Sequence, residues 1–156
     1  MTVKELMQTS VATVRGNETL LVAEDLMKTG WVRHVPVIDA SARVIGVLTQ
    51  RDLLKASMSP MASAGPLDQQ RWLERLFVRD IMSKKPVTIG PEADLAEAVD
   101  KLLAGKFGCL PVVENGALVG LITETDLLQH LRMLLQKRDR SSVSLRTKTK
   151  KQVLSK

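Results

Sequence analysis

The sequence contains two copies of one pattern, and this internal repeat constrains the fold more than any other feature. The segment Val-Lys-Glu-Leu-Met that begins at Val3 recurs as Val-Arg-Asp-Ile-Met beginning at Val78, 75 residues later. The same offset relates further pairs: Thr13 and Thr88, Leu20 and Leu95, Ala23 and Ala98, Gly30 and Gly105, Pro36 and Pro111. After one residue is lost in a turn, an offset of 74 relates Gly46 to Gly120, Thr49 to Thr123 and Asp52 to Asp126. An ordered series with a single gap indicates a duplicated structural unit.

Each copy predicts the element order β-α-β-β-α. Apolar residues at helical spacing predict helices over residues 20–27 and 95–103, and Gly30 and Gly105 stand where a helix C-terminal glycine is expected. Short β-branched runs predict strands, over residues 35–38 and 44–48 in the first copy and 110–113 and 118–122 in the second. Asn115 and Gly116 predict a tight hairpin turn. A further helix is predicted to open at Asp52 and at Asp126.

The repeat also predicts the domain organisation. We expect four regions: a first repeat (1–57), a linker loop and helix (58–77), a second repeat (78–135) and a basic, flexible tail (136–156). Within the linker, residues 57–66 are typical of a flexible loop, and residues 67–77 predict an amphipathic helix with Trp72 as a packing anchor. A unit of about 55 residues buries too little apolar surface to be comfortably stable alone. The fold class is therefore α/β (α+β), with two repeats packed as a pseudo-two-fold pair.

The charge is unevenly distributed along the chain. The net charge is +6, but residues 136–156 carry eight basic side chains and one acid, whereas residues 1–135 carry fifteen basic and sixteen acidic ones. The repeats are thus nearly neutral. A single cysteine, Cys109, excludes an internal disulfide, and neither a secretory signal nor a long apolar run is present, so we expect a cytoplasmic protein with no membrane contact.

The recurring polar residues are Thr49 and Asp52 in the first copy and Thr123 and Asp126 in the second, each pair at a strand end that turns into a helix. The Thr-x-x-Asp spacing is typical of a capping box, which is a purely structural device. The same geometry also suits a ribose-phosphate, because a helix start with a hydroxyl beside it can bind phosphate and a carboxylate can accept hydrogen bonds from two ribose hydroxyls. The two interpretations do not exclude each other.

The order of these motifs resembles the cystathionine-β-synthase (CBS) domain. The match covers residues 3–57 and 78–131 and includes the Val-x-acid-Ile/Leu-Met start, the Pro-Val strand and the Gly-x-x-Thr-x-x-Asp turn. The resemblance implies a tandem pair, or Bateman module, whose two clefts hold AMP, ADP, ATP or S-adenosylmethionine as a regulatory ligand rather than as a cofactor. It also implies a homodimer, with the apolar helices after Asp52 and Asp126 as candidates for the contact.

The same resemblance implies roles for individual residues. Asp52 and Asp126 would bind the ribose hydroxyls, and Thr49, Thr123 and Thr125 would face the phosphates. The adenine wall would be formed by Thr13, Val14 and Val32, with Arg33 nearby, in the Asp126 cleft, and by Thr88, Ile89 and Phe107 in the Asp52 cleft. The clefts are expected to be unequal, because Arg51 and Arg33 of the first copy are matched by Thr125 and Gly108 in the second.

Two classes of function remain open from the sequence. The first is a regulatory, energy-sensing module that binds an adenosyl ligand and acts on a separate, unknown protein. The second is an adaptor whose basic tail binds nucleic acid or an acidic partner, with the repeats as scaffold. No nucleophile-base arrangement, zinc-ligand spacing or glycine-rich phosphate loop is present, so we expect neither an enzyme nor a metal site. The choice among AMP, ATP, S-adenosylmethionine, NAD and a cyclic dinucleotide is also open.

Overall fold

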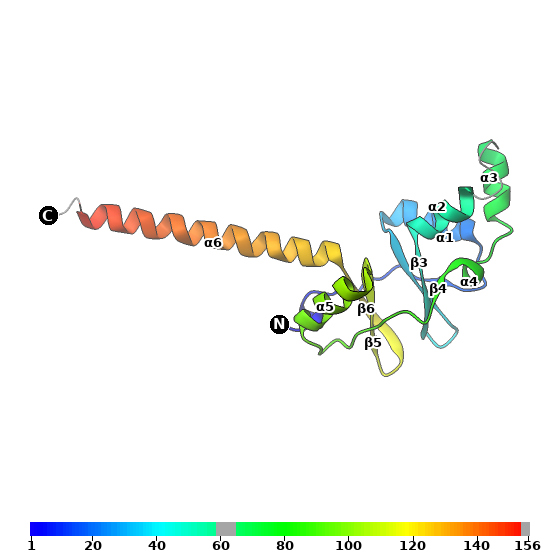
Figure 1. Cartoon of the computed structure of the whole chain (residues 1–156), viewed down its shortest axis with the longest axis horizontal. Coiled ribbons are helices and arrows are strands. Elements are labelled where there is room, and N and C mark those ends of the chain that lie inside the picture. Colours follow the sequence, from blue (N-terminus) through cyan, green and yellow to red (C-terminus); the bar gives the residue numbers. More distant parts are fainter. Residues whose placement is uncertain (59–64, 154–156) are drawn as a thin grey trace. The chain divides into compact units, whose positions relative to one another are not determined.

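The computed structural model describes the backbone of residues 1–58 and 65–153, and side chains as far as residue 138. The chain divides into two compact units, Met1–Ile122 and Thr123–Lys156. Its elements in order are η1 (Val3–Glu5), β1 (Val14–Arg15), α1 (Leu20–Gly30), β2 (His34–Ile38), β3 (Val44–Thr49), α2 (Gln50–Met58), α3 (Pro66–Leu73), α4 (Val78–Ile81), β4 (Ser83–Lys84), α5 (Leu95–Gly105), β5 (Cys109–Glu114), β6 (Ala117–Thr123) and α6 (Glu124–Val153). The mixed α/β fold predicted from the repeat is confirmed (Figure 1).

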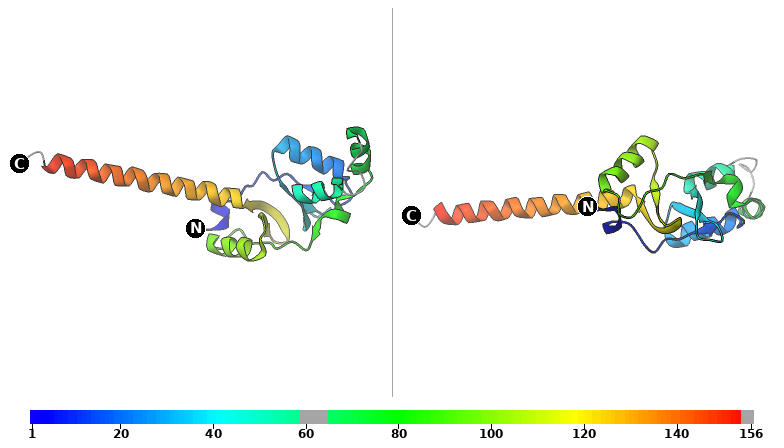
Figure 2. Two further views of the ribbon diagram at one scale, coloured as in Figure 1. Left: turned by 45° about the horizontal axis from the view of Figure 1, so that its top comes forward. Right: turned by 90° about the horizontal axis from the view of Figure 1, so that it is seen from below.

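The first repeat is built on a four-stranded sheet in the order β1-β2-β3-β4. Strand β2 pairs in parallel with β1 and antiparallel with β3, and β3 pairs antiparallel with β4. The consecutive residues Val35, Pro36 and Val37 of β2 are all buried, as expected for a central strand covered on both faces. Helices α1 and α2 contact each other and pack on β2 and β3 (Figures 1 and 2). This packing forms the main core, which includes Leu20, Ala23 and Met27 of α1 at the predicted helical spacing.

The second repeat contains the equivalent elements, a two-stranded sheet of β5 and β6 and the helix α5. Its hairpin turns at Asn115 and Gly116, whose φ angles are 50° and 84°. Both residues are therefore in the left-handed region that a tight hairpin turn requires, which confirms the turn predicted there. Ala98 and Leu102 of α5 are buried, also as predicted from their spacing.

The predicted role of the helix-terminal glycines is wrong by one position. Gly30 and Gly105 are the last residues of α1 and α5, and the left-handed residues are the next ones, Trp31 with φ 52° and Lys106 with φ 51°. Gly105 leaves room for the ring of Phe107, which a Cβ atom at this position would displace. The glycine thus allows the aromatic ring to fold back over the helix end.

The linker also differs from the prediction. Of the predicted loop 57–66, Ser57 and Met58 belong to α2 and residues 59–64 lie outside the described part of the chain. The predicted helix 67–77 ends at Leu73, and Phe77 has extended backbone (φ −94°, ψ 146°) as the N-cap residue of α4. Trp72 is the packing anchor that we expected: its indole N–H donates to the carbonyl of Ala56 at 3.0 Å, and its ring packs against the first core.

The first segment of each copy packs on the other copy. The backbone N–H of Val78 donates to the carbonyl of Glu18 at 2.9 Å, and the N–H of Val3 donates to the carbonyl of Ala93 at the same distance. These two bonds are related by the 75-residue offset. The methionine at the end of each segment follows the same rule, because Met82 contacts Gly46 and Met7 contacts Gly120. Each repeat therefore completes its core with chain from its partner repeat.

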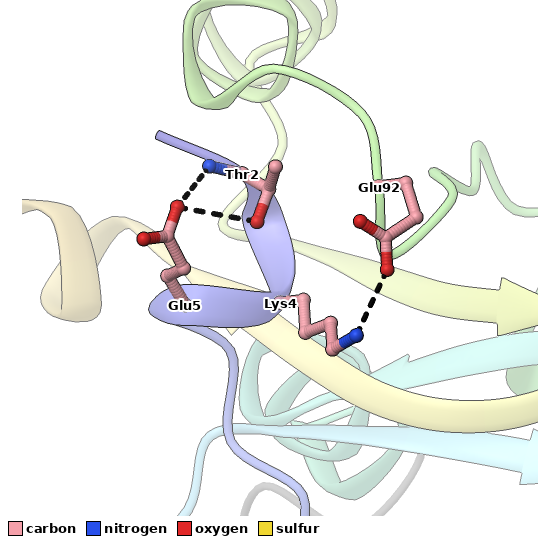
Figure 3. A network of polar contacts seen from close by, with 4 residues as sticks. All are labelled: Thr2, Lys4, Glu5 and Glu92. Carbon is pink, nitrogen blue, oxygen red and sulfur yellow. Dashed lines mark hydrogen bonds and ion pairs between the residues drawn. The ribbon is translucent and has the colours of Figure 1, made fainter.

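The N-terminal segment is further held by the polar contacts shown in Figure 3. The carboxylate of Glu5 accepts the backbone N–H of Thr2 at 2.6 Å, and this bond lowers the pKa of Glu5. Lys4 forms an ion pair with Glu92 at 3.0 Å. Both groups of this pair are largely exposed, so solvent screens it and it contributes little to stability.

Helix α6 runs past residue 136, where the predicted helix ends, to Val153. Residues 124–153 contain neither glycine nor proline, so nothing in the local sequence breaks the helix. The alternative that the basic residues 136–156 bind a partner stays open. No helix in the described part of the chain is both long and apolar enough to cross a membrane.

Candidate functional site

The turn from β3 into α2 brings Thr49 and Asp52 together. One carboxylate oxygen of Asp52, Oδ2, accepts the Thr49 backbone N–H at 2.9 Å and the Thr49 hydroxyl at 2.7 Å. The Thr49 hydroxyl oxygen in turn accepts the backbone N–H of Asp52 at 3.2 Å. The capping arrangement predicted from the spacing is therefore present. The second oxygen of this carboxylate, Oδ1, accepts no hydrogen bond from the residues that the structure describes.

The turn into α6 repeats this geometry. Oδ2 of Asp126 accepts the backbone N–H of Thr123 at 2.8 Å and its hydroxyl at 2.6 Å, and the Asp126 N–H donates to the hydroxyl oxygen at 3.3 Å. Asp126 is buried, with 7% of its surface exposed, whereas Thr125 is exposed. The two turns are thus equal in their internal hydrogen bonds.

A partly open cavity of about 170 Å³ lies beside the Thr49 turn. Strands β2 and β3 of the first repeat form one side of it, and residues 83–87 and 106–111 of the second repeat form the other. Its lining residues are His34, Val47, Thr49, Ser83, Pro86, Val87, Lys106, Phe107, Gly108, Cys109 and Pro111. The walls are therefore mostly apolar, with two hydroxyls (Thr49 and Ser83), a thiol, an imidazole and one ammonium group added. This composition is typical of a small-molecule site.

The predicted residues of the Asp52 cleft fall into three groups in the structure. Thr49, Phe107 and Gly108 line the cavity, and Asp52 is bonded directly to Thr49. Ile89 is buried and pairs with Val112 instead, while the Thr88 carbonyl accepts a hydrogen bond from Lys101. Arg51 is exposed on α2 and does not line the cavity.

The predicted residues of the Asp126 cleft lie partly around a second hollow. Val32 and Arg33 line an open depression of about 510 Å³ together with Met27, Lys28, Trp31 and Gln50. Val14 is buried in the first core, and Thr13 beside it is half-buried. The site that would join these residues to Asp126 remains a prediction.

The comparisons with known proteins identify the family. The CBS domain profile matches residues 3–59 and 78–133, which are the two repeats. This chain belongs to the CBS domain family. A CBS domain-containing protein of Dictyostelium discoideum is 33% identical over 135 residues, which cover 86% of this chain and 93% of the relative. Other curated relatives are longer, and the chain spans about a fifth of their length.

Solved structures agree with this assignment. An acetoin utilization protein (AcuB) of Vibrio cholerae has 31% sequence identity and a TM-score of 0.74, and the match covers 90% of this chain and 96% of that one. CBSX2, which is from Arabidopsis thaliana and was solved in complex with AMP, has 25% identity and a TM-score of 0.72 over 85% of this chain and 97% of its own. The tandem CBS pair expected from the sequence is thus confirmed.

The structure of the CBS pair adds residues that the sequence prediction missed. Pro86 and Val87 line the cavity from the segment that leads from β4 towards α5, and Lys106 lines it from the end of α5. Lys106 matches Trp31 at the 75-residue offset, and in the structure both residues adjoin a hollow. Within the described residues, no cluster of histidine, cysteine, aspartate and glutamate could hold a metal ion.

Cys109 provides a chemical probe of the cavity in this CBS pair. Burial raises the pKa of its thiol to about 12, and only 7% of its surface is exposed. Since the thiolate is the nucleophile, alkylation by iodoacetamide should rise about tenfold per pH unit between pH 7 and 9.5 without a plateau. In urea the same thiol should level off above about pH 8.5. A plateau near pH 8.5 in the folded protein would contradict the buried environment.

Proposed function

We propose that this CBS pair is a regulatory, non-catalytic module that binds an adenine nucleotide in the cavity beside Thr49 and Asp52. One observation carries the proposal: the apolar cavity borders a turn in which a threonine hydroxyl and a half-buried carboxylate stand side by side. The apolar walls suit a purine base, and the free Oδ1 of Asp52 is available to ribose hydroxyls. The AMP complex of CBSX2 supports adenine as the base.

Different residues of the cavity would contact the base and the ribose of the nucleotide. The ring of Phe107, which is 38% exposed, offers a face on which a base can stack, and Val47 and Val87 add apolar contact. The Thr49 hydroxyl donates its proton to Asp52, so toward the ligand it would act as an acceptor for a ribose hydroxyl. A cavity of about 170 Å³ is smaller than a typical ligand pocket of about 300 Å³, so part of the nucleotide would extend through the open side.

The proposed function also includes a homodimer and a separate protein that the module regulates. Leu54 and Met58 on α2 are exposed, and so are Leu128 and Leu131 on α6. These apolar side chains support the homodimer expected from the resemblance, because isolated helices rarely expose several large apolar residues without a partner. A change in nucleotide occupancy would then be transmitted to a separate regulated protein.

Isothermal titration calorimetry tests the proposed function directly. AMP, ADP, ATP and S-adenosylmethionine should be titrated into the full chain, with CMP as the control that keeps the phosphate and changes the base. We expect at least one adenine nucleotide to bind and CMP to bind at least about tenfold more weakly. At a hundredfold excess over its Kd, the ligand should add about 2.7 kcal/mol to the free energy of unfolding. Absence of heat and of any melting shift with all four ligands would contradict the proposal.

A further inference from the structure

Lys106 is held in a defined position at the cavity. It follows the last residue of α5 in a left-handed conformation, and the next residue, Phe107, donates its backbone N–H to the carbonyl of Leu102 at 3.0 Å. The ring of Phe107 lies over Gly105, where a Cβ atom would displace it. The left-handed turn therefore places Lys106, an exposed residue, at the edge of the cavity that it lines.

Lys106 brings a positive charge to the cavity, across from the half-buried carboxylate of Asp52, which is bonded to Thr49. Among the lining residues Lys106 is the one with a permanent charge, and no carboxylate is among them. Lys106 forms no ion pair with any described residue, in contrast to Lys101, which is bonded to Glu97 at 2.9 Å. An unpaired ammonium group beside an apolar cavity favours an anionic ligand.

The two hollows obtain their positive charge from different positions of the repeat. The residue that matches Lys106 in the first copy is Trp31, which is 94% exposed and carries no charge. The residue that matches Arg33 is Gly108, so the cavity has no guanidinium at that place. Lys106 thus supplies the cavity with a cation that the other hollow obtains from Lys28 and Arg33.

We infer that Lys106 is the residue that makes this cavity selective for phosphorylated adenosyl ligands over adenosine and S-adenosylmethionine. Lysine binds phosphate as a mobile point charge, and the bond is charge-assisted. Adenosine has no anionic group for it to bind, and the sulfonium of S-adenosylmethionine is repelled by it. This inference rests on the proposed function and names the ligand class of the same site.

The test compares AMP with adenosine in charge variants of the full chain. Lys106→Met keeps the length of the side chain and removes its charge, and Lys106→Glu reverses the charge. Lys55→Met, an exposed position on α2 outside both hollows, is the control with the same change in net charge. We expect Lys106→Met to weaken AMP about tenfold and to leave adenosine within about twofold, as for one partly exposed charge-assisted bond.

Different results would contradict the inference about Lys106 and the proposed function. We expect Lys106→Glu to weaken AMP further and to improve binding of S-adenosylmethionine relative to AMP, while Lys55→Met binds all three ligands as the natural chain does. An unchanged ratio of AMP to adenosine affinity in Lys106→Met would overturn the inference about Lys106 and leave adenosyl binding intact. If the natural chain bound neither AMP nor adenosine, the proposed function would fall and the inference with it.

Discussion

Val78→Asp should strongly destabilise the first repeat, although Val78 lies at the start of the second repeat in the sequence. Val78 is fully buried in the first core, where it packs among residues of α1 and β2. A carboxylate at this position would be removed from water with no cation to pair with it. An unpaired buried charge costs about 3–5 kcal/mol, which is a large part of the roughly 5–15 kcal/mol that stabilises an ordinary domain.

Urea unfolding followed by circular dichroism measures this effect. The matched control is Val22→Asp on α1, where the side chain is 46% exposed and the change in free energy of unfolding should stay within about 0.5 kcal/mol. Val3→Asp should be nearly as damaging as Val78→Asp, because Val3 is fully buried against the second repeat at the equivalent position. Equal urea midpoints for Val78→Asp and Val22→Asp would show that the exchanged segment does not support the core.

The exchange of these segments illustrates what a repeated sequence can and cannot predict. The offset of 75 residues predicted that Val3 and Val78 are equivalent, and their matched hydrogen bonds confirm it. It could not predict on which copy each segment packs, because both copies offer the same complementary surface. Only the path of the chain in space, which takes Phe77 and Val78 beside Thr19 and Glu18, decides between the alternatives.

The sequence predicted only some of the residues of the candidate site. Thr49 and Asp52 were accessible because they are neighbours in one turn, so local spacing alone brings them together. Phe107 and Gly108 came only through the resemblance to a family. Pro86, Val87 and Lys106 were missed because they line the cavity from segments far from Thr49 in sequence, and nothing in their local pattern distinguishes them from ordinary surface residues.

Helix ends were the least predictable features of the fold. The amphipathic pattern of residues 67–77 extends beyond Leu73, but the pairing of Leu76 with Leu20 pulls the chain into an extended conformation. Tertiary contact thus overrides helical propensity at that point. The sequence predicted Gly105 only as a helix-terminal glycine. In the structure it also leaves room for the ring of Phe107, a tertiary contact that the local pattern does not indicate.

Asp52→Ala should lower AMP affinity about a hundredfold while costing little stability. The carboxylate has two separable tasks, because Oδ2 is used by the Thr49 cap and Oδ1 is left for the ligand. Loss of a helix cap costs about 1 kcal/mol of unfolding free energy. Loss of charge-assisted bonds to two ribose hydroxyls removes about 3 kcal/mol of binding free energy, which corresponds to the hundredfold change.

Asp94→Ala is the control that removes a helix cap without removing a predicted ligand contact. Asp94 caps α5, where its carboxylate accepts the backbone N–H of Ala96 at 2.8 Å, and it lines neither hollow. Both variants should therefore lose about 1 kcal/mol in urea unfolding, whereas calorimetry should show weakened AMP binding for Asp52→Ala alone. Equal AMP affinity in the two variants would reduce Asp52 to a structural cap.

Asp126→Ala then decides which turn holds the nucleotide. Its hydrogen bonds match those of Asp52 within 0.1 Å, so hydrogen-bond geometry does not distinguish the two turns. If the cavity beside Thr49 is the main site, Asp52→Ala should abolish more of the measured binding than Asp126→Ala. The reverse result would move the site to the second turn, and unchanged AMP affinity in both variants would rule out the Thr-x-x-Asp turns as the ligand site. Because the bonds within the two turns match, a difference in AMP affinity between Asp52→Ala and Asp126→Ala would measure the effect of their different surroundings.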